Sequence, residues 1–165
     1  CAGGGGKTLA LAAEMQGSGQ IYAHDANPSR MKDLPERARR AGADIQVISP
    51  EHIESSPKCD LVLVDAPCSG SGTWRRAPDA KWRLTPERLA ELKALQQSIL
   101  QDAAQLVRPG GWLAYATCSL LAGENTAQIA AFLAANPSWQ CKDEMRLVPG
   151  SEGDGFYLAV IQRGT

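Results

Sequence analysis

Two cysteines stand in short polar segments that directly follow apolar runs, and thiols in such positions can act as nucleophiles. Cys68 lies in an Asp-Ala-Pro-Cys-Ser-Gly segment after the apolar run 61–64, and Cys118 lies in a Thr-Cys-Ser segment after the run 112–116. Uncharged runs that end at Asp, Pro or Thr are typical of buried strands. Ligands bind at the carboxyl ends of such strands in open α/β sheets, so we expect the two thiols to share one site.

A glycine-rich segment at residues 1–8, Cys-Ala-Gly-Gly-Gly-Gly-Lys-Thr, precedes a helix-forming stretch that ends near Met15. Consecutive glycines let the backbone approach a ligand closely, and the N–H groups of a helix start favour polar or anionic groups. Asp25 follows the predicted strand 20–24, about twenty residues beyond the glycines, where an acid usually binds the ribose hydroxyls. The pattern predicts a site for a nucleoside-containing cofactor.

Strand and helix patterns alternate along the chain, which predicts an α/β fold with a doubly wound, mostly parallel sheet closed by two late strands. The predicted strands are 20–24, 45–48, 61–64, 112–116, 140–147 and 155–161. The predicted helices are 8–15, 28–41 with a break at Pro35, 85–107 capped by Thr85, and 124–135. Because no strand precedes the glycines, we expect the chain to be a fragment whose first strand lies upstream.

The apolar spacing along the predicted helix 85–107 indicates which of its side chains face the core. These are Leu89, Leu92, Leu95, Ile99, Ala103 and Leu106. Trp112 and Trp139 are also expected in the core, and Cys59 and Cys141 are expected to be small buried apolar side chains. The segment 108–111, Arg-Pro-Gly-Gly, is predicted to form a turn before the next strand.

The segment 70–84 is predicted to be a long irregular loop in which basic and aromatic residues alternate beside a single acid, Asp79. Such interleaving is typical of surfaces that bind single-stranded or unstacked nucleic acid. The candidate RNA-binding residues are Trp74, Arg75, Arg76, Lys81 and Trp82.

Composition limits the function classes only weakly. The 17 basic and 18 acidic side chains give a formal net charge of −1, so any binding of nucleic acid must come from local patches or from further domains. Five cysteines are too few for a secreted disulfide scaffold and indicate reduced thiols in a cytoplasmic setting. We expect one domain over residues 1–165, with no membrane segment and no metal site. We also expect a monomer, although no pattern in the sequence reports the oligomeric state.

Taken together, these motifs resemble the Sun/nucleolar-protein family of S-adenosylmethionine-dependent RNA (cytosine-5)-methyltransferases over essentially the whole chain. The stretch 73–82 is most similar to the bacterial small-subunit rRNA enzymes. The resemblance implies a Rossmann-like class I methyltransferase fold, with an N-terminal RNA-binding region outside this chain. It extends to Gly110-Gly111, Glu124-Asn125 and Gly153-Asp154-Gly155-Phe156.

The resemblance also implies roles for individual residues. Cys118 would attack carbon 6 of the cytosine, Cys68 would help the covalent adduct break down, and Asp65 would bind the N3/N4 edge of the base. Family members usually have Ala-Pro where this chain has Gly3-Gly4, and Glu51 is the nearest match to their acid beside the adenine. The cofactor site would comprise Cys1, Ala2, Gly3, Gly4, Gly5, Gly6, Lys7, Asp25, Glu51 and Asp65.

Three other functions remain open at this point. A tRNA (cytosine-5)-methyltransferase would carry the same motifs, whereas an inactive RNA-binding module would have no need to keep both Cys68 and Cys118. A nucleotide hydrolase built on Gly6-Lys7-Thr8 would need an earlier glycine and a magnesium-binding acid. DNA is disfavoured as a substrate, because DNA cytosine methyltransferases use the cysteine of the Pro-Cys pair as nucleophile and lack the Thr-Cys-Ser partner.

Overall fold

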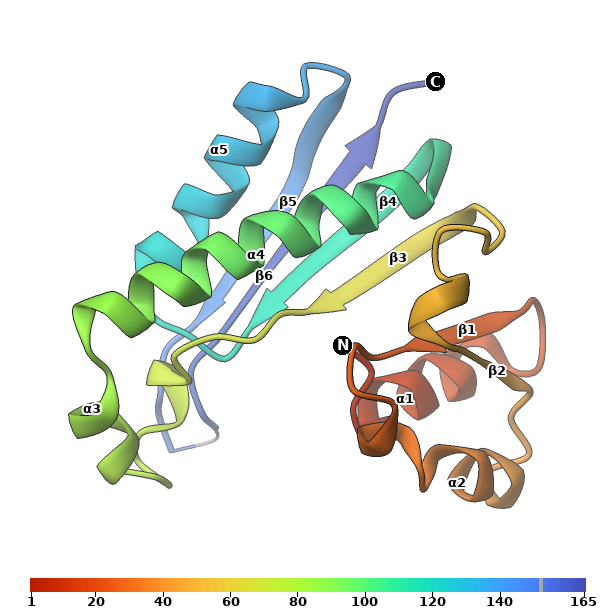
Figure 1. The fold of residues 1–165 in the computed structure, drawn as a ribbon, viewed down its shortest axis with the longest axis horizontal. Helices are drawn as coiled ribbons and strands as arrows, with labels where there is room; N and C mark the ends of the chain where they lie inside the picture. Colours follow the sequence, from red (N-terminus) through yellow and green to blue (C-terminus); the bar gives the residue numbers. More distant parts are fainter. Residues whose placement is uncertain (152) are drawn as a thin grey trace. The chain divides into compact units, whose positions relative to one another are not determined.

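Residues 1–57 form a small α/β unit around two parallel strands, β1 (Ile21–His24) and β2 (Ile45–Ile48). The computed structural model in Figure 1 describes residues 1–151 and 153–165. Three buried side chains, Ala23, Met31 and Leu34, form the core of this unit. Its helical segments are α1 (Gly6–Met15), η1 (Pro28–Met31), α2 (Leu34–Arg40) and η2 (Pro50–His52).

The break predicted at Pro35 is confirmed. The helical pattern 28–41 divides into the short η1 and the separate helix α2, and Pro35 stands in the first turn of α2. Proline is tolerated there because the first N–H groups of a helix have no intrahelical partner. Leu34, the residue before it, is fully buried and packs below the glycine segment.

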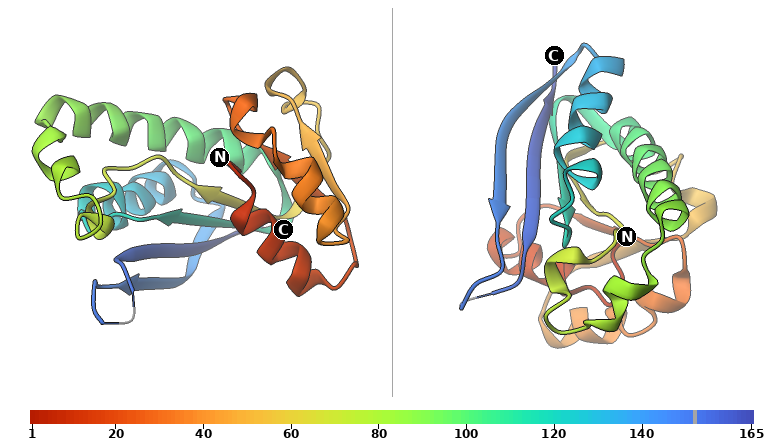
Figure 2. Two further views of the ribbon diagram at one scale, coloured as in Figure 1. Left: turned by 90° about the horizontal axis from the view of Figure 1, so that it is seen from below. Right: turned by 90° about the vertical axis from the view of Figure 1, so that its left-hand side faces the viewer.

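Residues 58–165 form a second unit with a four-stranded sheet in the order β3-β4-β6-β5. The pair β3–β4 is parallel, whereas β6 is antiparallel to both β4 and β5. Helices α4 and α5 lie on one face of this sheet, as Figure 1 and the right-hand view of Figure 2 show. The elements are β3 (Cys59–Asp65), η3 (Ser71–Thr73), α3 (Asp79–Arg83), α4 (Pro86–Leu106), β4 (Val107–Thr117), η4 (Ala122–Glu124), α5 (Thr126–Ala135), β5 (Trp139–Leu147) and β6 (Phe156–Arg163).

A single apolar core fills the space between this sheet and its two helices. Tyr115 and Tyr157 lie edge to face there, with ring centroids 6.4 Å apart, and Phe132 meets Trp139 at 5.5 Å. The core position predicted for Trp139 is therefore confirmed. No helix in the described part of the chain has the length and apolar character that a bilayer-spanning segment needs.

The long helix α4 begins where its cap predicts, but it presents a different face to the core. Thr85 Oγ1 accepts the N–H of Arg88 at 3.2 Å, as expected of an N-cap. Leu95 is 46% exposed, however, so its predicted core position is wrong. Gln96 is buried instead, because its amide donates to the carbonyl of Pro67 and to a carboxylate, which satisfies its N–H groups. The buried face of α4 comprises Leu92, Gln96, Leu100, Ala103 and Ala104.

Several other local predictions are wrong. The segment 70–84 is not wholly irregular, since it contains η3 and the short helix α3. The segment 108–111 is no separate turn but belongs to β4, which begins at Val107. Trp112 is 37% exposed on the sheet, and Cys141 is exposed on the edge strand β5.

The orientation of α4 predicts a large difference between two leucines on the same helix. Leu100→Ala removes a side chain that is 1% exposed and should lower the free energy of unfolding by about 2–5 kcal/mol. Leu95→Ala, the matched control, should lower it by less than about 1 kcal/mol. Urea unfolding of the full-length protein measures both changes, and equal losses would contradict the orientation.

Candidate functional site: a two-cysteine site at the ends of adjacent strands

The parallel pairing of β3 with β4 brings the two cysteine loops together. Asp65, the last residue of β3, lies opposite Ala116 of β4, so both strands end at the same edge of the sheet. Each chain then enters a loop, and the Cys68 Sγ lies 3.4 Å from the Cys118 Sγ. The prediction that both thiols share one site is confirmed. Asp65 is partly buried at the same strand end.

The neighbouring thiol and burial both affect the protonation of Cys68. The hydrogen bond with the Cys118 side chain, and then burial, raise the pKa of Cys68 well above its ordinary range. Cys68 therefore keeps its proton at neutral pH. Either sulfur of the pair can be the hydrogen-bond donor, and the thiolate is the form of cysteine that acts as a nucleophile.

A buried carboxylate joins the loops that carry the two cysteines. Glu124 is completely buried, and its Oε1 accepts the N–H of Ser69 at 2.8 Å. Its Oε2 accepts the hydroxyls of Ser69 and Ser119, both at 2.5 Å. Each serine directly follows one of the cysteines. The sequence assigned no function to Glu124, Ser69 or Ser119. Its signals were the Glu124-Asn125 pair within the family resemblance and the position of the two serines after the two cysteines.

Asn125 holds the residues on both sides of Cys118. Its Oδ1 accepts the hydroxyl of Thr117 at 2.7 Å, and its Nδ2 donates to the carbonyl of Ser119 at 2.8 Å. Thr117 Oγ1 in turn accepts the N–H of Ser119 at 3.1 Å. Hydrogen bonds therefore hold the Thr-Cys-Ser segment at the residues on both sides of Cys118.

A third loop, before β6, packs through Gly155 against Gly72 of the loop after β3, and Gly72 in turn bonds to the Cys118 loop. The N–H of Gly72 donates to the carbonyl of Cys118, and the N–H of Gly155 donates to the carbonyl of Gly72, both at 2.9 Å. A Cβ on Gly72 would stand 2.3 Å from the Gly155 oxygen, so only glycine permits this approach. The loop before β6 thereby supports the site.

The structure separates the candidate RNA-binding residues into two groups. Arg75 and Arg76 form ion pairs with Asp154 at 3.1 and 2.6 Å, so they tie the loop after β3 to the loop before β6. Trp74 is partly buried, with its indole N–H enclosed. In contrast, Lys81 and Trp82 are exposed on α3, and the Trp82 ring is 82% exposed. The side chains of Arg75 and Arg76 remain exposed despite these ion pairs, so both arginines, like Lys81 and Trp82, are open to a ligand.

Within residues 1–57, the structure brings Asp25 and the glycine segment together. Asp25 is 3% exposed, and its carboxylate accepts the N–H groups of Gly3 at 2.9 Å and Asn27 at 3.0 Å. Burial acts to raise the pKa of Asp25, but these hydrogen bonds and the nearby Arg30 guanidinium together lower it below its ordinary value. Asp25 is therefore an ionised acid that shapes the glycine turn.

The start of α1 and the position of Glu51 complete this region. Gly5 has a φ of 81° and precedes α1, whose first turn has no side-chain cap. A Cβ on Gly5 would stand 2.3 Å from Leu34 Cδ1, so the segment packs tightly only with glycine. Glu51 is exposed on η2 after β2, and a hydrogen bond from Ser49 lowers its pKa. Asp25 and Glu51 thus follow the ends of two paired parallel strands.

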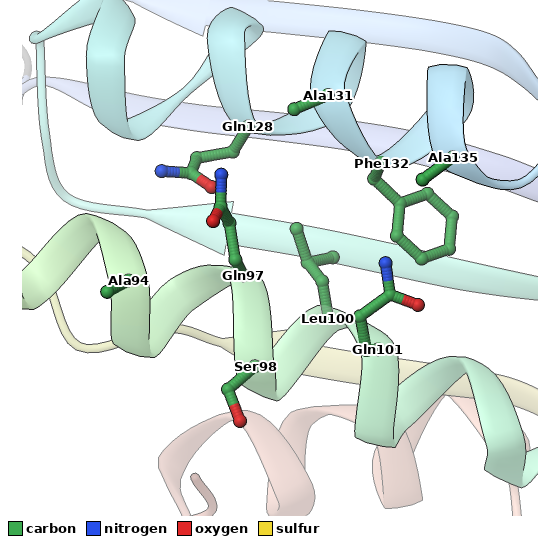
Figure 3. Close-up of a pocket in the computed structure, with 9 residues that line it drawn as sticks. All are labelled: Ala94, Gln97, Ser98, Leu100, Gln101, Gln128, Ala131, Phe132 and Ala135. Atoms are coloured by element: carbon green, nitrogen blue, oxygen red, sulfur yellow. The ribbon is translucent and has the colours of Figure 1, made fainter.

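A separate groove of ≈ 410 Å³ lies between α4 and α5, and Figure 3 shows the amides of Gln97 and Gln128 close together in it. Leu100 and Phe132 supply its apolar part. None of the candidate site residues lines this groove. Residues 1–151 and 153–165 contain no cluster of His, Cys, Asp or Glu side chains arranged to hold a metal ion.

Comparison of the sequence with family models identifies the family of this chain. A family model described as 16S rRNA methyltransferase RsmB/F matches residues 1–162. The chain belongs to the RsmB/F family. The resemblance to the bacterial small-subunit rRNA enzymes is thereby confirmed.

Curated relatives of the RsmB/F family extend beyond this chain. The ribosomal RNA small subunit methyltransferase B of Vibrio cholerae serotype O1 is 38% identical over 99% of this chain, which corresponds to 40% of that protein. The probable ribosomal RNA small subunit methyltransferase B of Synechocystis is 41% identical over 85% of this chain and 33% of that protein. The chain therefore spans about two fifths or less of the length of these relatives.

Solved structures confirm the predicted fold class. A methyltransferase homolog protein from Pyrococcus horikoshii has a TM-score of 0.81 and 29% identity, over 96% of this chain and 58% of that chain. NSun6 from the same organism, solved with SFG, has a TM-score of 0.87 at 22% identity, over 100% of this chain and 47% of that chain. The RsmB/F chain has the Rossmann-like class I methyltransferase fold.

The coupling of the two thiols predicts an effect of each on the other. In the full-length protein, Cys68 should react slowly with iodoacetamide at neutral pH, because its raised pKa leaves little thiolate. Cys118→Ala removes the largest cause of that shift and should speed alkylation of Cys68 by about tenfold, the equivalent of one pKa unit. Peptide mass spectrometry measures the rates, with Cys141→Ala as control. No acceleration in Cys118→Ala would contradict the coupling.

Proposed function

We propose that this RsmB/F chain is the catalytic part of an S-adenosylmethionine-dependent enzyme that methylates carbon 5 of a cytosine in ribosomal RNA. The observation that carries the proposal is the 3.4 Å separation of the Cys68 and Cys118 sulfurs at the ends of adjacent parallel strands. Carbon 5 of cytosine is a weak nucleophile, and addition of a thiolate to carbon 6 activates it. One thiol can form the adduct while a second acts on it.

Cys118 is the residue that attacks. Its sulfur, as the thiolate, forms a bond to carbon 6 of the cytosine, and N3 of the ring takes a proton from water, which it returns when the adduct breaks down. Asp65, at the end of β3, binds the N3/N4 edge and stabilises that protonated ring. S-adenosylmethionine supplies the electrophilic methyl group that carbon 5 then takes. Asn125 keeps Cys118 in place through the residues on either side of it.

Cys68 acts in the release of the product. Bonding to carbon 6 turns the Cys118 sulfur into a thioether, a weak acceptor, and so weakens the hydrogen bond that contributes most to the raised pKa of Cys68. The pKa of Cys68 then falls, and its proton passes to water. The Cys68 thiolate takes the proton from carbon 5, the double bond between carbons 5 and 6 re-forms, and the bond from carbon 6 to sulfur breaks. Cys118 is returned as a thiolate.

Residues 1–57 have the features that such a cofactor needs. The uncapped start of α1 offers N–H groups to a carboxylate, and the glycines leave room for close approach of a ligand. Asp25 is ionised at the same segment and would accept hydrogen bonds from a ribose. We assign the cofactor to the glycine segment 1–7 with Asp25, and Glu51 as a further contact.

The exposed helix α3 is the surface that we assign to the RNA. Lys81 Nζ lies 5.6 Å from the centroid of the Trp82 ring, so a cation and an aromatic face stand together. A base can stack on the ring while the ammonium group pairs with a phosphate. Ribosomal RNA is preferred over tRNA because the matching family and its curated relatives carry rRNA small-subunit names.

The proposed function predicts opposite behaviour of the two cysteine variants. With the full-length protein, radiolabelled S-adenosylmethionine and an unmodified small-subunit rRNA transcript, Cys118→Ala should abolish methyl transfer. Cys68→Ala should form the bond to RNA but release it slowly, so a denaturation-resistant protein–RNA adduct should accumulate. Cys141→Ala, an exposed cysteine on β5, is the control and should behave as wild type.

Three results would count against this function. Methyl transfer by Cys118→Ala would show that another group is the nucleophile. If the wild type transfers no methyl group to rRNA but does so to tRNA, the tRNA enzyme is correct, and if it binds RNA without any transfer, the inactive module is correct.

The exposed ring on α3 predicts a loss of RNA affinity on its removal. Trp82→Ala should weaken binding of the rRNA transcript by about 1–3 kcal/mol, the contribution of one base stacked on an aromatic side chain. Trp82→Phe keeps a ring and should retain most of the affinity. Filter binding at fixed salt measures both, and wild-type affinity in Trp82→Ala would exclude α3 from the RNA site.

A further inference from the structure

The carboxylate of Glu124 is the point where the two cysteine loops meet. It lies between Ser69, which follows Cys68, and Ser119, which follows Cys118. The amide of Gln96 donates to Oε1 of the same carboxylate at 3.0 Å. Ser119 and Gln96 are both completely buried. The backbone of Glu124 is itself held, because the hydroxyl of Tyr115 donates to its carbonyl at 2.8 Å. The carboxylate is therefore a rigid connection inside the protein.

Each hydrogen bond to this carboxylate has a defined donor. The N–H of Ser69 and the amide of Gln96 can only donate. Ser119 Oγ already accepts the N–H of Leu121 at 3.0 Å, which leaves its own hydrogen for Glu124 at 2.5 Å. Four donors thus converge on four acceptor positions, which an ionised carboxylate offers and an amide does not.

We propose that Glu124 is a positioning residue that fixes the separation of the Cys68 and Cys118 thiols. Neither cysteine lies in a helix or a strand, so the register of β3 and β4 alone does not fix the distance between the sulfurs. Glu124 supplies the missing constraint by binding the residue after each cysteine. Its consequence for catalysis rests on the proposed function, since Cys68 must reach an adduct on Cys118.

A cross-linking rate tests the separation without RNA or cofactor. In the full-length protein, diamide should oxidise Cys68 and Cys118 to a disulfide: each thiol loses one hydrogen, and the diazene is reduced to its hydrazine. Glu124→Gln places an amide among four donors and should slow this reaction by about tenfold or more. Glu91→Gln is the matched control, because Glu91 is exposed on α4, and it should react as wild type.

A kinetic measurement tests the catalytic consequence. Glu124→Gln should lower kcat for methylation by about 10²-fold, the usual effect of a misplacement of about 1 Å, with little change in the KM for RNA or S-adenosylmethionine. If Glu124→Gln cross-links more slowly than the wild type but the wild type methylates nothing, the proposed function fails while the positioning role stands. Equal cross-linking rates in wild type and Glu124→Gln, fast or slow, overturn the positioning role whatever the methylation assay gives.

Ser69→Ala provides the same test if Glu124→Gln does not fold. It removes the hydroxyl that bonds Oε2 and leaves the Ser69 N–H bond and the buried carboxylate in place. Cross-linking should slow to a smaller extent than in Glu124→Gln. Ser98→Ala on α4, whose serine does not line the cysteine site, is the control and should cross-link as wild type. Wild-type rates in Ser69→Ala would overturn the proposal.

Discussion

The register of β3 against β4 is the constraint on which the rest of the site depends. Parallel pairing of Asp65 with Ala116 makes both strands end at one edge of the sheet. Cys68 and Cys118 follow within a few residues of that edge. The apolar runs of these strands pack under α4 and α5, so the register is held by the core. A slip of one residue would turn the buried side chains outward, and the strand pair is therefore strongly specified.

Beyond the ends of the strands, hydrogen bonds between polar groups, rather than apolar packing, hold the loops in place. The loops that carry Cys68 and Cys118 are joined by hydrogen bonds to buried side chains and by the close approach of Gly72 to Gly155. In the proposed mechanism, the hydrogen bond that raises the pKa of Cys68 weakens when Cys118 forms its adduct. One contact would then keep Cys68 protonated before attack and let it act as a base afterwards. In that mechanism, the order of the two steps follows from this contact.

Local patterns in the sequence predicted the strands, the helix cap at Thr85 and the meeting of the two cysteines, because each depends on neighbouring residues and on strand direction. The buried face of α4 was predicted incorrectly, since Gln96 is polar and its burial depends on partners elsewhere in the chain. The bond from Ser69 to Glu124 spans 55 positions, and the ion pair of Arg75 with Asp154 spans 79. No local periodicity reports such pairs, so the groups that hold the site were visible only in the structure.

The central claim is that Cys118 forms the covalent bond and Cys68 does not. An rRNA transcript with cytosines fluorinated at carbon 5 tests it most directly, because loss of the carbon 5 proton becomes impossible and the adduct persists. After incubation of the full-length protein with this RNA and S-adenosylmethionine, nuclease and protease digestion and mass spectrometry identify the modified peptide. We expect the nucleotide on the peptide that contains Cys118. A nucleotide on the Cys68 peptide would contradict the account.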